Sequence, residues 1–442
     1  MTTTPAAEGK SLRYAWFVAT LLTLAHILSF VDRQILNLLV GPIRKDLDIS
    51  DTQMSLLLGL SFAVFYTLCG IPLARWADSR SRRGLVTAGA FAWSVATAGC
   101  GMAQNYGQML LARIGVGVGE ATLSPAAFSL ITDYFPREKR ASAISLFVMG
   151  VYFGSGLAFL IGGAVIKFAS TQGPVLLPLL GEIRPWQLVF LILGVFGAVF
   201  SLLLLLIREP ARTTEKAKPM PISAVFSKLR EHRRTLFCHH MGFALFSLAG
   251  YGSSAWLPSF FIRVHGWTPS EVGTTYGIIL AVFGTLGVIT GGRMGDRGHR
   301  MGQTDATMRI GMLAALCAIP CSLGFLLSDQ YWVIVALLSI GTFFFSMPFG
   351  CAAAGLQEIV PIAMRAQASA VYLFVLNMVG LGLGPTAVAL MTDYVFKDDL
   401  AVGHSLMVIS TCALSLTALL LWLGQAPFRE SYARQRLADS AG

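Results

Sequence analysis

The sequence predicts an all-α polytopic membrane protein whose twelve transmembrane helices form two pseudosymmetric six-helix bundles. Three observations predict this fold: an apolar composition, twelve apolar runs of membrane-spanning length, and loop patterns that recur at about half the chain length. Of the 442 residues, 55% are hydrophobic and 13% are charged, against roughly 25% charged residues in an ordinary soluble domain. This composition excludes a soluble enzyme, a disordered protein and a disulfide-rich secreted domain.

Each predicted helix is an apolar run between polar breaks, and about 20 residues are enough to cross the hydrocarbon core of a bilayer. The runs cover residues 14–40, 53–77, 85–104, 107–133, 141–167, 186–207, 236–262, 271–292, 306–327, 331–357, 366–392 and 402–424. The seventh run is the least clear, because Cys238, His239 and His240 open it. We expect its two histidines to be solvated near the membrane surface.

The basic residues predict the orientation of these helices. Twenty-five of the 33 Lys and Arg residues fall on the two termini and on the loops of the same side, and six fall on the opposite loops. Cytoplasmic loops are the ones enriched in Lys and Arg. We therefore expect a multi-pass plasma-membrane protein (inner membrane in a bacterium) with both termini in the cytoplasm. The net charge of +10 reflects this topology, so no nucleic-acid partner is expected.

The longest polar interval divides the chain into equal halves. We expect an N-terminal six-helix bundle at 1–207, a cytoplasmic linker at 208–235 and a C-terminal six-helix bundle at 236–442. Four apolar residues of the linker recur at helical spacing: Ile222, Val225, Phe226 and Leu229. This spacing favours an amphipathic helix on the membrane surface, with a basic disordered linker as the alternative.

Two pairs of loops show that the halves resemble each other. ARWADSRSRR (74–83) follows the second run and GRMGDRGHR (292–300) follows the eighth, so that Asp78 and Asp296 correspond. DYFPREKRASA (133–143) and EIVPIAMRAQA (358–368) follow the fourth and tenth runs in the same way. Duplicated halves of this kind are typical of secondary transporters that bind substrate near the bilayer midplane.

With these loops the chain resembles the major facilitator superfamily over essentially its full length. The first copy of the family's loop signature has Ala74, Ser79 and Ser81 where the family prefers Gly, Arg and Gly. The resemblance implies a cytoplasmic gate, and the alternative is that these arginines only fix the topology. The gate residues that it implies are Asp78, Arg82, Arg83, Asp296, Arg297 and Arg300. Asp133 and Glu358, at cytoplasmic helix ends, and the matched Arg140 and Arg365 of the second pair of loops are further gate candidates.

Only four of the charged side chains lie deep within predicted helices: Asp32, Arg33, Arg113 and Glu120. Intramembrane charges are costly, so they are functional candidates. At about 1.5 Å per residue, Asp32 and Arg113 lie roughly 12 Å and 9 Å below the outer surface, which predicts an Asp32–Arg113 pair. Glu120 lies roughly 10 Å deeper, near the membrane centre. Arg33 faces either the same cavity or an adjacent helix.

Such a set of charges can couple protons to transport. A buried carboxylate that loses its arginine takes up a proton, and one that regains the arginine releases it. We expect Glu120 and Asp32 to carry protons, and Arg113 and Arg33 to hold an anionic headgroup. The alternative is a permanent ion pair that fixes helix packing.

FVDRQILNLL (30–39) and ARIGVGVGEA (112–121) resemble the spinster group of this superfamily, which includes lysolipid and sphingosine-1-phosphate exporters. The resemblance implies an amphiphilic, lipid-like substrate, and it assigns the four buried charges to proton coupling and headgroup recognition. Side chains of the second half are candidate cavity linings, although such a stripe often faces lipid: Phe243, Phe246, Tyr251, Phe343, Phe344, Met347 and Asn377.

We therefore expect a monomeric secondary transporter that moves a lysolipid-like or sphingoid amphiphile, coupled to protons, without a cofactor or metal. A carrier of small organic anions, with Arg113 as the carboxylate clamp, is the first alternative. A membrane enzyme or nontransporting receptor is remote, because the sequence has no P-loop, no metal-spaced His/Cys set and no nucleophile elbow.

Overall fold

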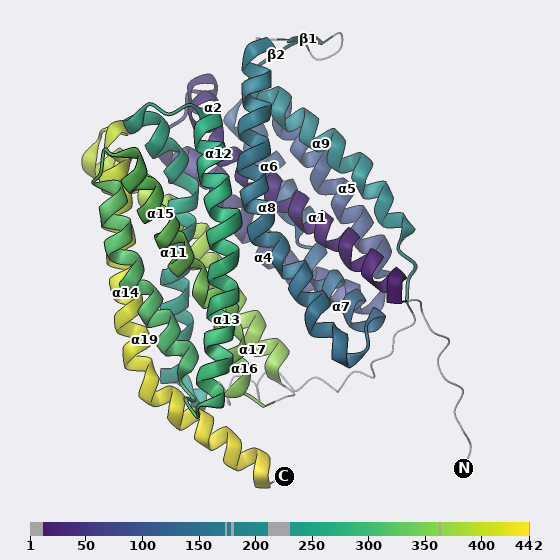
Figure 1. The fold of residues 1–442 in the computed structure, drawn as a ribbon. Coiled ribbons are helices and arrows are strands. Elements are labelled where there is room, and N and C mark those ends of the chain that lie inside the picture. Colours follow the sequence, from purple (N-terminus) through teal and green to yellow (C-terminus); the bar gives the residue numbers. More distant parts are fainter. Residues whose placement is uncertain (1–11, 173–174, 178–180, 211–229, 362–363, 442) are drawn as a thin grey trace.

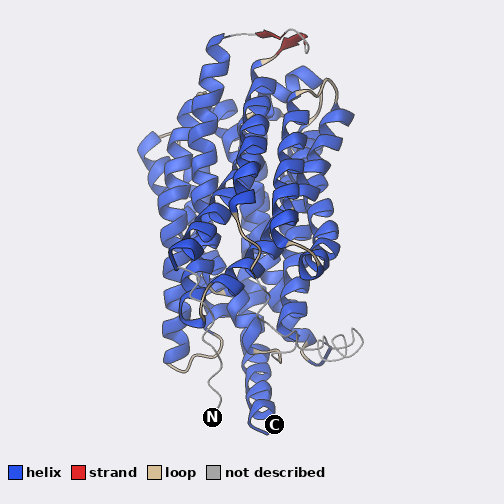
Figure 2. Cartoon of the chain, turned by 90° about the vertical axis from the view of Figure 1, so that its right-hand side faces the viewer, coloured by secondary structure: helices blue, strands red, loops and turns tan. Residues whose placement is uncertain are grey.

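A computed structural model of the protein describes residues 12–172, 175–177, 181–210, 230–361 and 364–441. Within these ranges the chain is helical apart from turns and one antiparallel strand pair, β1 (Val175–Leu177) and β2 (Gly181–Ile183). The amphipathic helix expected within the linker lies outside the described residues. The long helices run roughly side by side, with the strand pair at one end (Figures 1 and 2).

The first bundle supplies six membrane spans, three of which combine several helical segments. Its elements are α1 (Leu12–Leu38), α2 (Val40–Leu47), α3 (Asp51–Ser55), η1 (Leu56–Leu60), α4 (Ser61–Ser79), α5 (Arg82–Gly101), α6 (Tyr106–Glu120), α7 (Leu123–Tyr134), α8 (Arg137–Gln172), α9 (Pro185–Leu203) and η2 (Leu204–Leu206).

The second bundle repeats this arrangement. Its elements are α11 (Arg233–His265), α12 (Pro269–Ile279), η3 (Leu280–Gly284), α13 (Thr285–Arg300), α14 (Ala306–Leu326), α15 (Tyr331–Ser346), η4 (Met347–Gly350), α16 (Ala352–Glu358), α17 (Arg365–Val375), η6 (Leu376–Gly382), α18 (Leu383–Leu390), η7 (Met391–Phe396), η8 (Asp399–Ala401) and α19 (Val402–Ala441). The segments η1, η3, η6 and η7 are π-helical.

Eleven of the described helical segments are long and apolar enough to cross a membrane, and α11 is the twelfth span. α11 has 33 residues, but its histidines, glycines and serines lower its hydropathy. It packs against α19, α18, η6 and α1, so little of its surface has to face lipid. The fold is therefore a twelve-helix membrane bundle, as the sequence predicts.

The contacts between the bundles follow the symmetry of the repeat. α8 of the first bundle packs on α12 and η3, and α4 with η1 packs on η6 and α18 of the second. In the order of spans, the fifth meets the eighth and the second meets the eleventh. The fifth and eleventh spans are equivalent in the repeat, as are the second and eighth, so the two contacts are equivalent too. This is expected for two duplicated bundles.

Packing between the bundles is concentrated in the half of the molecule remote from the chain ends. One apolar core in that half draws on both bundles, for example Leu57 and Phe159 from the first and Trp256 and Tyr276 from the second. Two further cores contain residues of the second bundle only. We call the face where Leu12 and the end of α19 lie the terminal face, and the other the opposite face (Figure 1).

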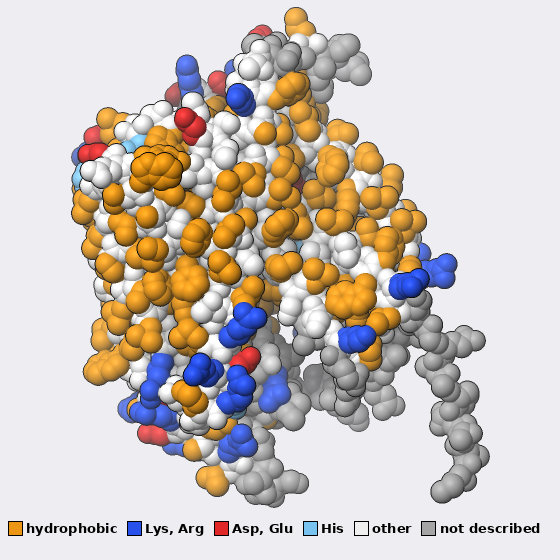
Figure 3. Space-filling model, in the orientation of Figure 1, with side chains coloured by type: hydrophobic (Ala, Val, Ile, Leu, Met, Phe, Trp, Pro, Cys, Tyr) orange, Lys and Arg blue, Asp and Glu red, His pale blue; other side chains and the backbone are white. Residues whose placement is uncertain are grey.

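The surface agrees with a membrane environment. Hydrophobic side chains cover the middle of the molecule in Figure 3, whereas the Lys and Arg side chains visible there gather mainly toward the terminal face. Many large apolar residues at mid-height are half exposed, among them Phe91, Val195 and Leu419. Apolar surface of this extent is stable in lipid and not in water.

Candidate functional site

The helix of the fourth span is interrupted directly after Glu120, which carries a buried carboxylate. α6 ends at Glu120 and α7 begins at Leu123. Pro125 has no N–H to donate to the carbonyl four residues earlier, at Ala121, and its ring would clash with that carbonyl in a continuous helix. Pro125 therefore interrupts the fourth span, and Glu120 becomes the last residue of α6.

Glu120 forms an ion pair with Arg33 of α1. Arg33 donates from Nε at 2.6 Å and places Nη2 at 2.5 Å, in both cases toward Oε2 of Glu120. The Glu120 side chain has no exposed surface, and that of Arg33 is 15% exposed. Oε1 of Glu120 is buried without a hydrogen-bond partner. A cation beside the end of α6 is also favoured by the helix dipole, which would otherwise oppose a carboxylate there.

Three aromatic rings surround the guanidinium of Arg33. Its central carbon lies 4.8 Å from the ring centroid of Phe30, 4.4 Å from that of Phe62 and 4.9 Å from that of Tyr66. Phe62 reaches this position because Gly117 of α6 lets the two main chains meet: a Cβ on Gly117 would lie 3.0 Å from the Phe62 carbonyl oxygen. Arg33 therefore sits in an aromatic cage closed by one carboxylate.

The expected Asp32–Arg113 ion pair is wrong. Arg113 instead donates to main-chain carbonyls, from Nε to Leu57 at 3.3 Å and from Nη1 to the Asp32 oxygen at 3.4 Å. No described ion pair includes the Asp32 carboxylate, which is 5% exposed. The prediction compared only the depths of the Cα atoms. It did not account for the lengths of the side chains: Arg33 reaches along the helix to Glu120, and Arg113 reaches main-chain carbonyls.

The seven residues predicted to line the cavity differ in where they pack and in how deeply they are buried. Tyr251 is half-buried and packs against the core of the first bundle. Asn377 is half-buried in η6. Phe343 and Phe344 are also half-buried, but they pack on a core of the second bundle. Phe243, Phe246 and Met347 are at most 5% exposed within that bundle, so their assignment to a cavity wall is wrong.

The two histidines at the start of the seventh span are not solvated, contrary to expectation. His239 is fully buried and its Nε2 lies 3.1 Å from the Ala352 carbonyl oxygen. His240 is 8% exposed. Their rings pack against Tyr372, because the span extends beyond them to Arg233 and carries them below the surface.

The predicted gate residues of the first bundle pair within that bundle. Arg82, at the start of α5, forms an ion pair with Asp133 of α7 and a second with Glu209 at 2.9 Å. The amide of Arg83 donates to Glu209 at 2.9 Å, and Nε of Arg140 donates to the Phe135 carbonyl at 2.9 Å. The side chain of Asp78 lies outside the described residues.

These contacts shift the pKa of Glu209, which follows the last span of the first bundle. Burial alone raises the pKa of this carboxyl. The amide of Arg83 and the side chains of Arg82 and Ser81 donate hydrogen bonds to it, and together they hold its pKa below its usual value. The carboxylate therefore remains charged and ties the α4–α5 loop to the end of the bundle.

Three of the five predicted gate residues of the second bundle line a cavity of about 610 Å³ on the terminal face. Asp296, Arg300 and Glu358 line it, and His299 Nδ1 lies 3.5 Å from the Glu358 carboxylate. Arg297 and Arg365 are exposed. In this conformation, none of the described ion pairs of the predicted gate residues joins the two bundles.

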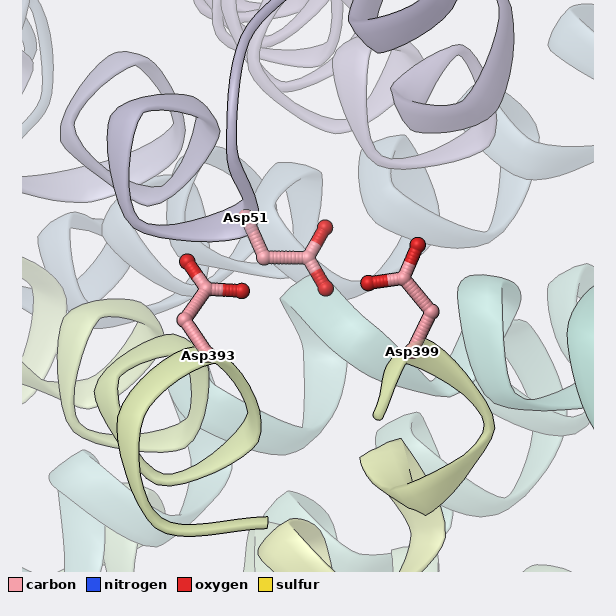
Figure 4. Close-up of side chains that lie close together, drawn as sticks. All are labelled: Asp51, Asp393 and Asp399. Atoms are coloured by element: carbon pink, nitrogen blue, oxygen red, sulfur yellow. The ribbon is translucent and has the colours of Figure 1, made fainter. Parts of the chain in front are cut away.

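An ion network on the opposite face does join the bundles. Asp51, at the start of α3 and fully buried, accepts hydrogen bonds from both terminal nitrogens of Arg263, at 2.6 and 2.8 Å. Arg44 lies 2.9 Å from Asp51 and 2.8 Å from Asp399. Asp393 accepts from Thr52 at 2.6 Å. Figure 4 shows the carboxylates of Asp51, Asp393 and Asp399 turned toward one another.

Sequence reasoning missed this network. Its carboxylate oxygens lie within 4.8 Å of one another, as in a metal site, but the two arginines already neutralise two of the three charges. A second polar contact lies toward the membrane centre, where Asn37 donates to the Ser254 carbonyl at 3.1 Å. The only signal in the sequence was a cluster of acids and arginines beside the spans, which topology alone also explains.

Known proteins resemble the chain along nearly its whole length. A model of the Major Facilitator Superfamily matches residues 22–385. An MFS-type efflux pump of Mycolicibacterium smegmatis is 29% identical, covering 96% of each chain. The D-galactonate transporter of Escherichia coli O6:H1 is 26% identical, covering 92% of this chain and 95% of that one. A crystal structure of a bacterial homolog to the human lysosomal transporter Spinster, inward-facing and unoccupied, gives a TM-score of 0.77 at 27% identity, covering 96% of this chain and 98% of that one.

Proposed function

We propose a substrate and a driving force for this chain, which belongs to the Major Facilitator Superfamily as a spinster-like transporter and is not an enzyme. It moves a lysolipid-like or sphingoid amphiphile across the plasma membrane by alternating access, coupled to protons. The observation that carries the proposal is the Arg33–Glu120 pair at the centre of the first bundle.

The pair provides a proton switch. While Arg33 holds Glu120, the carboxylate stays charged without water, because its partner supplies the opposite charge. When Arg33 turns away and no other cation takes its place, a carboxylate with no exposed surface is costly and takes up a proton. Asp32, the residue directly before Arg33 on α1, is the second candidate carrier, and Arg113 and Arg33 contact the headgroup.

Alternating access requires one face to be closed while the other opens. The Asp51–Arg263 network and the shared apolar core close the opposite face. The predicted gate residues of the terminal face pair within their own bundles. The excess of Lys and Arg on the termini and on the loops of the same side supports a cytoplasmic terminal face. We therefore assign this conformation as inward-facing, with 1–207 and 236–442 as the moving bundles and the 208–235 linker between them.

An amphiphile suits the surroundings of the charges. The polar groups of Arg33 and Glu120 are flanked by aromatic faces from α1 and α4, and Tyr251 of the second bundle packs against the core that contains Phe62. A substrate with one charged end and an apolar tail can use both kinds of surface. The likeness to a bacterial homolog of Spinster agrees with the resemblance to the spinster group, and that resemblance implies an amphiphilic substrate.

A small organic anion is the second candidate substrate. The resemblance to a D-galactonate transporter favours it, as does the buried guanidinium of Arg113, which could hold a carboxylate. In this conformation, main-chain carbonyls accept from Arg113, so this use requires those hydrogen bonds to break.

Transport by the purified protein in proteoliposomes separates the two candidates. We expect saturable movement of a lysophospholipid and none of D-galactonate. Arg113→Ala should weaken the binding of an anionic lysolipid more than that of a zwitterionic one. The control is Arg184→Ala, which removes an exposed arginine of the opposite face. Transport of D-galactonate without any lysolipid movement would replace the proposal with the organic-anion carrier.

A further inference from the structure

The aromatic cage around Arg33 has the composition of a site for an ammonium ion. Three ring faces, from Phe30, Phe62 and Tyr66, lie within 4.9 Å of one cationic carbon, and the Glu120 carboxylate closes the fourth side. Ring faces attract cations through their quadrupoles, and cages of this kind bind quaternary ammonium groups. At present the cation is one of the protein's own side chains.

The exposed fractions of the side chains indicate which member of the cage can move out of it. Glu120 has no exposed surface and Phe62 is 1% exposed, so both are fixed by packing. Phe62 also stacks on Tyr66 with centroids 5.3 Å apart. Arg33, at 15%, and Tyr66 are the partly exposed members, and the long side chain of Arg33 can turn away while Phe30 and Phe62 stay buried. The cage therefore remains when its occupant departs.

Glu120 has room for another cationic partner. Both short contacts from Arg33 go to Oε2, whereas the buried Oε1 has no hydrogen-bond partner. A carboxylate oxygen in this state can face a cation that offers no directed hydrogen bonds. A trimethylammonium group is such a cation, since its charge is spread over methyl groups that also pack against aromatic faces.

We propose that the cage of Phe30, Phe62, Tyr66 and Glu120 binds the ammonium end of a zwitterionic lysophospholipid, which takes the place of the Arg33 guanidinium. The released Arg33 then pairs with the phosphate of the same headgroup. One internal ion pair is exchanged for two with the substrate, and the net charge of the site does not change. This inference rests on the proposed lysolipid function and specifies its headgroup.

The first test compares two lysolipids with the same acyl chain in proteoliposomes of the full-length protein. Lysophosphatidylcholine carries the quaternary ammonium, and lysophosphatidylglycerol does not. The cage predicts a half-saturation concentration about tenfold lower for lysophosphatidylcholine, a typical effect of desolvated cation–ring contacts. Equal values for the two lipids would overturn the cage while leaving the lysolipid function intact. Movement of neither lipid would overturn both.

Variants of the cage provide the second test. Tyr66→Leu and Phe62→Leu remove a ring but keep apolar volume, so each should raise the half-saturation concentration severalfold for lysophosphatidylcholine and by a clearly smaller factor for lysophosphatidylglycerol. Tyr66→Phe keeps the ring face and should behave as the wild type. Phe65→Leu, on the same helix but 37% exposed, is the matched control. An equal loss for both lipids in monodisperse variants would contradict the cage.

A third measurement needs no variant. Tetramethylammonium chloride should inhibit lysophosphatidylcholine uptake by the wild-type protein, because the ion fits the cage, whereas sodium chloride at the same ionic strength should not. If the two salts have the same effect, the rings do not bind the ammonium group and the proposal is wrong.

Discussion

Nη2 of Arg33 lies 2.5 Å from Oε2 of Glu120, although the two residues are separated by 87 positions in the sequence. The first is on α1, and the second ends α6 at the break that Pro125 imposes. This contact joins two helices of one bundle through opposite charges inside the membrane. Its making and breaking is the step that the proposed mechanism requires, and several predictions depend on it.

Removing one partner of this pair should destabilise the protein. Arg33→Ala leaves the Glu120 carboxylate buried without a counter-charge, which costs about 3–5 kcal/mol. Equilibrium unfolding in detergent at neutral pH measures the loss. The double variant Arg33→Ala/Glu120→Gln should recover most of it, because no buried charge remains. An equal loss in the single and double variants would mean that packing of Arg33, and not its charge, stabilises the bundle.

Weakening the network on the opposite face should favour opening of that face. Arg263→Gln removes two charged hydrogen bonds to the buried Asp51, an effect of about 2 kcal/mol or about thirtyfold in a population ratio. Spin labels at Lys45→Cys and Leu400→Cys, with the exposed Cys412 replaced by Ser, report the separation of the bundles. We expect a longer distance to become populated.

The control for this experiment lies on the same face. Arg184 pairs with Asp46 at 3.3 Å within the first bundle, so Arg184→Gln breaks an ion pair without affecting the contact between bundles. It should leave the label distances unchanged. If Arg263→Gln also leaves them unchanged, the network does not hold the opposite face closed.

The stability of the terminal face should fall in acid. The folded pKa of Glu209 is depressed below its ordinary value of 4.5 by hydrogen bonds from Arg82, Arg83 and Ser81, which outweigh burial. Its contribution is therefore present above pH 4.5 and is lost as the pH falls through the folded pKa. Glu209→Gln should reduce the difference in melting temperature between pH 7 and pH 3. The exposed Glu182→Gln is the control, and an equal effect of both would contradict this role.

The sequence predicts the spans well because membrane insertion depends on local hydropathy. Pro125 also indicates the interruption of the fourth span, since a proline acts on the helix that contains it. The four intramembrane charges are recognisable as a group for the same reason: each is costly in its own apolar run. These features all depend on residues that are near one another in the chain.

Features that depend on distant residues are less predictable. Arg33 reaches Glu120 by the length of its side chain, and Arg113 bonds the main-chain oxygen of Asp32 and not its carboxylate. A depth measured at the Cα distinguishes neither contact. Asp51 and Arg263 lie 212 positions apart, and each alone resembles an ordinary loop charge. Phe243 and Phe246 fit a cavity wall or a core equally well in sequence, and packing within the second bundle decides for the core.

The most direct test of the account is transport by Glu120→Gln under an imposed pH gradient. Proteoliposomes containing the wild-type protein should move a lysophospholipid faster with the gradient than without it. Glu120→Gln cannot exchange a proton, so its transport should be the same under both conditions, whereas the exposed Glu182→Gln should behave as the wild type. A wild-type response to the pH gradient that persists undiminished in Glu120→Gln would contradict the role of this carboxylate as the proton carrier.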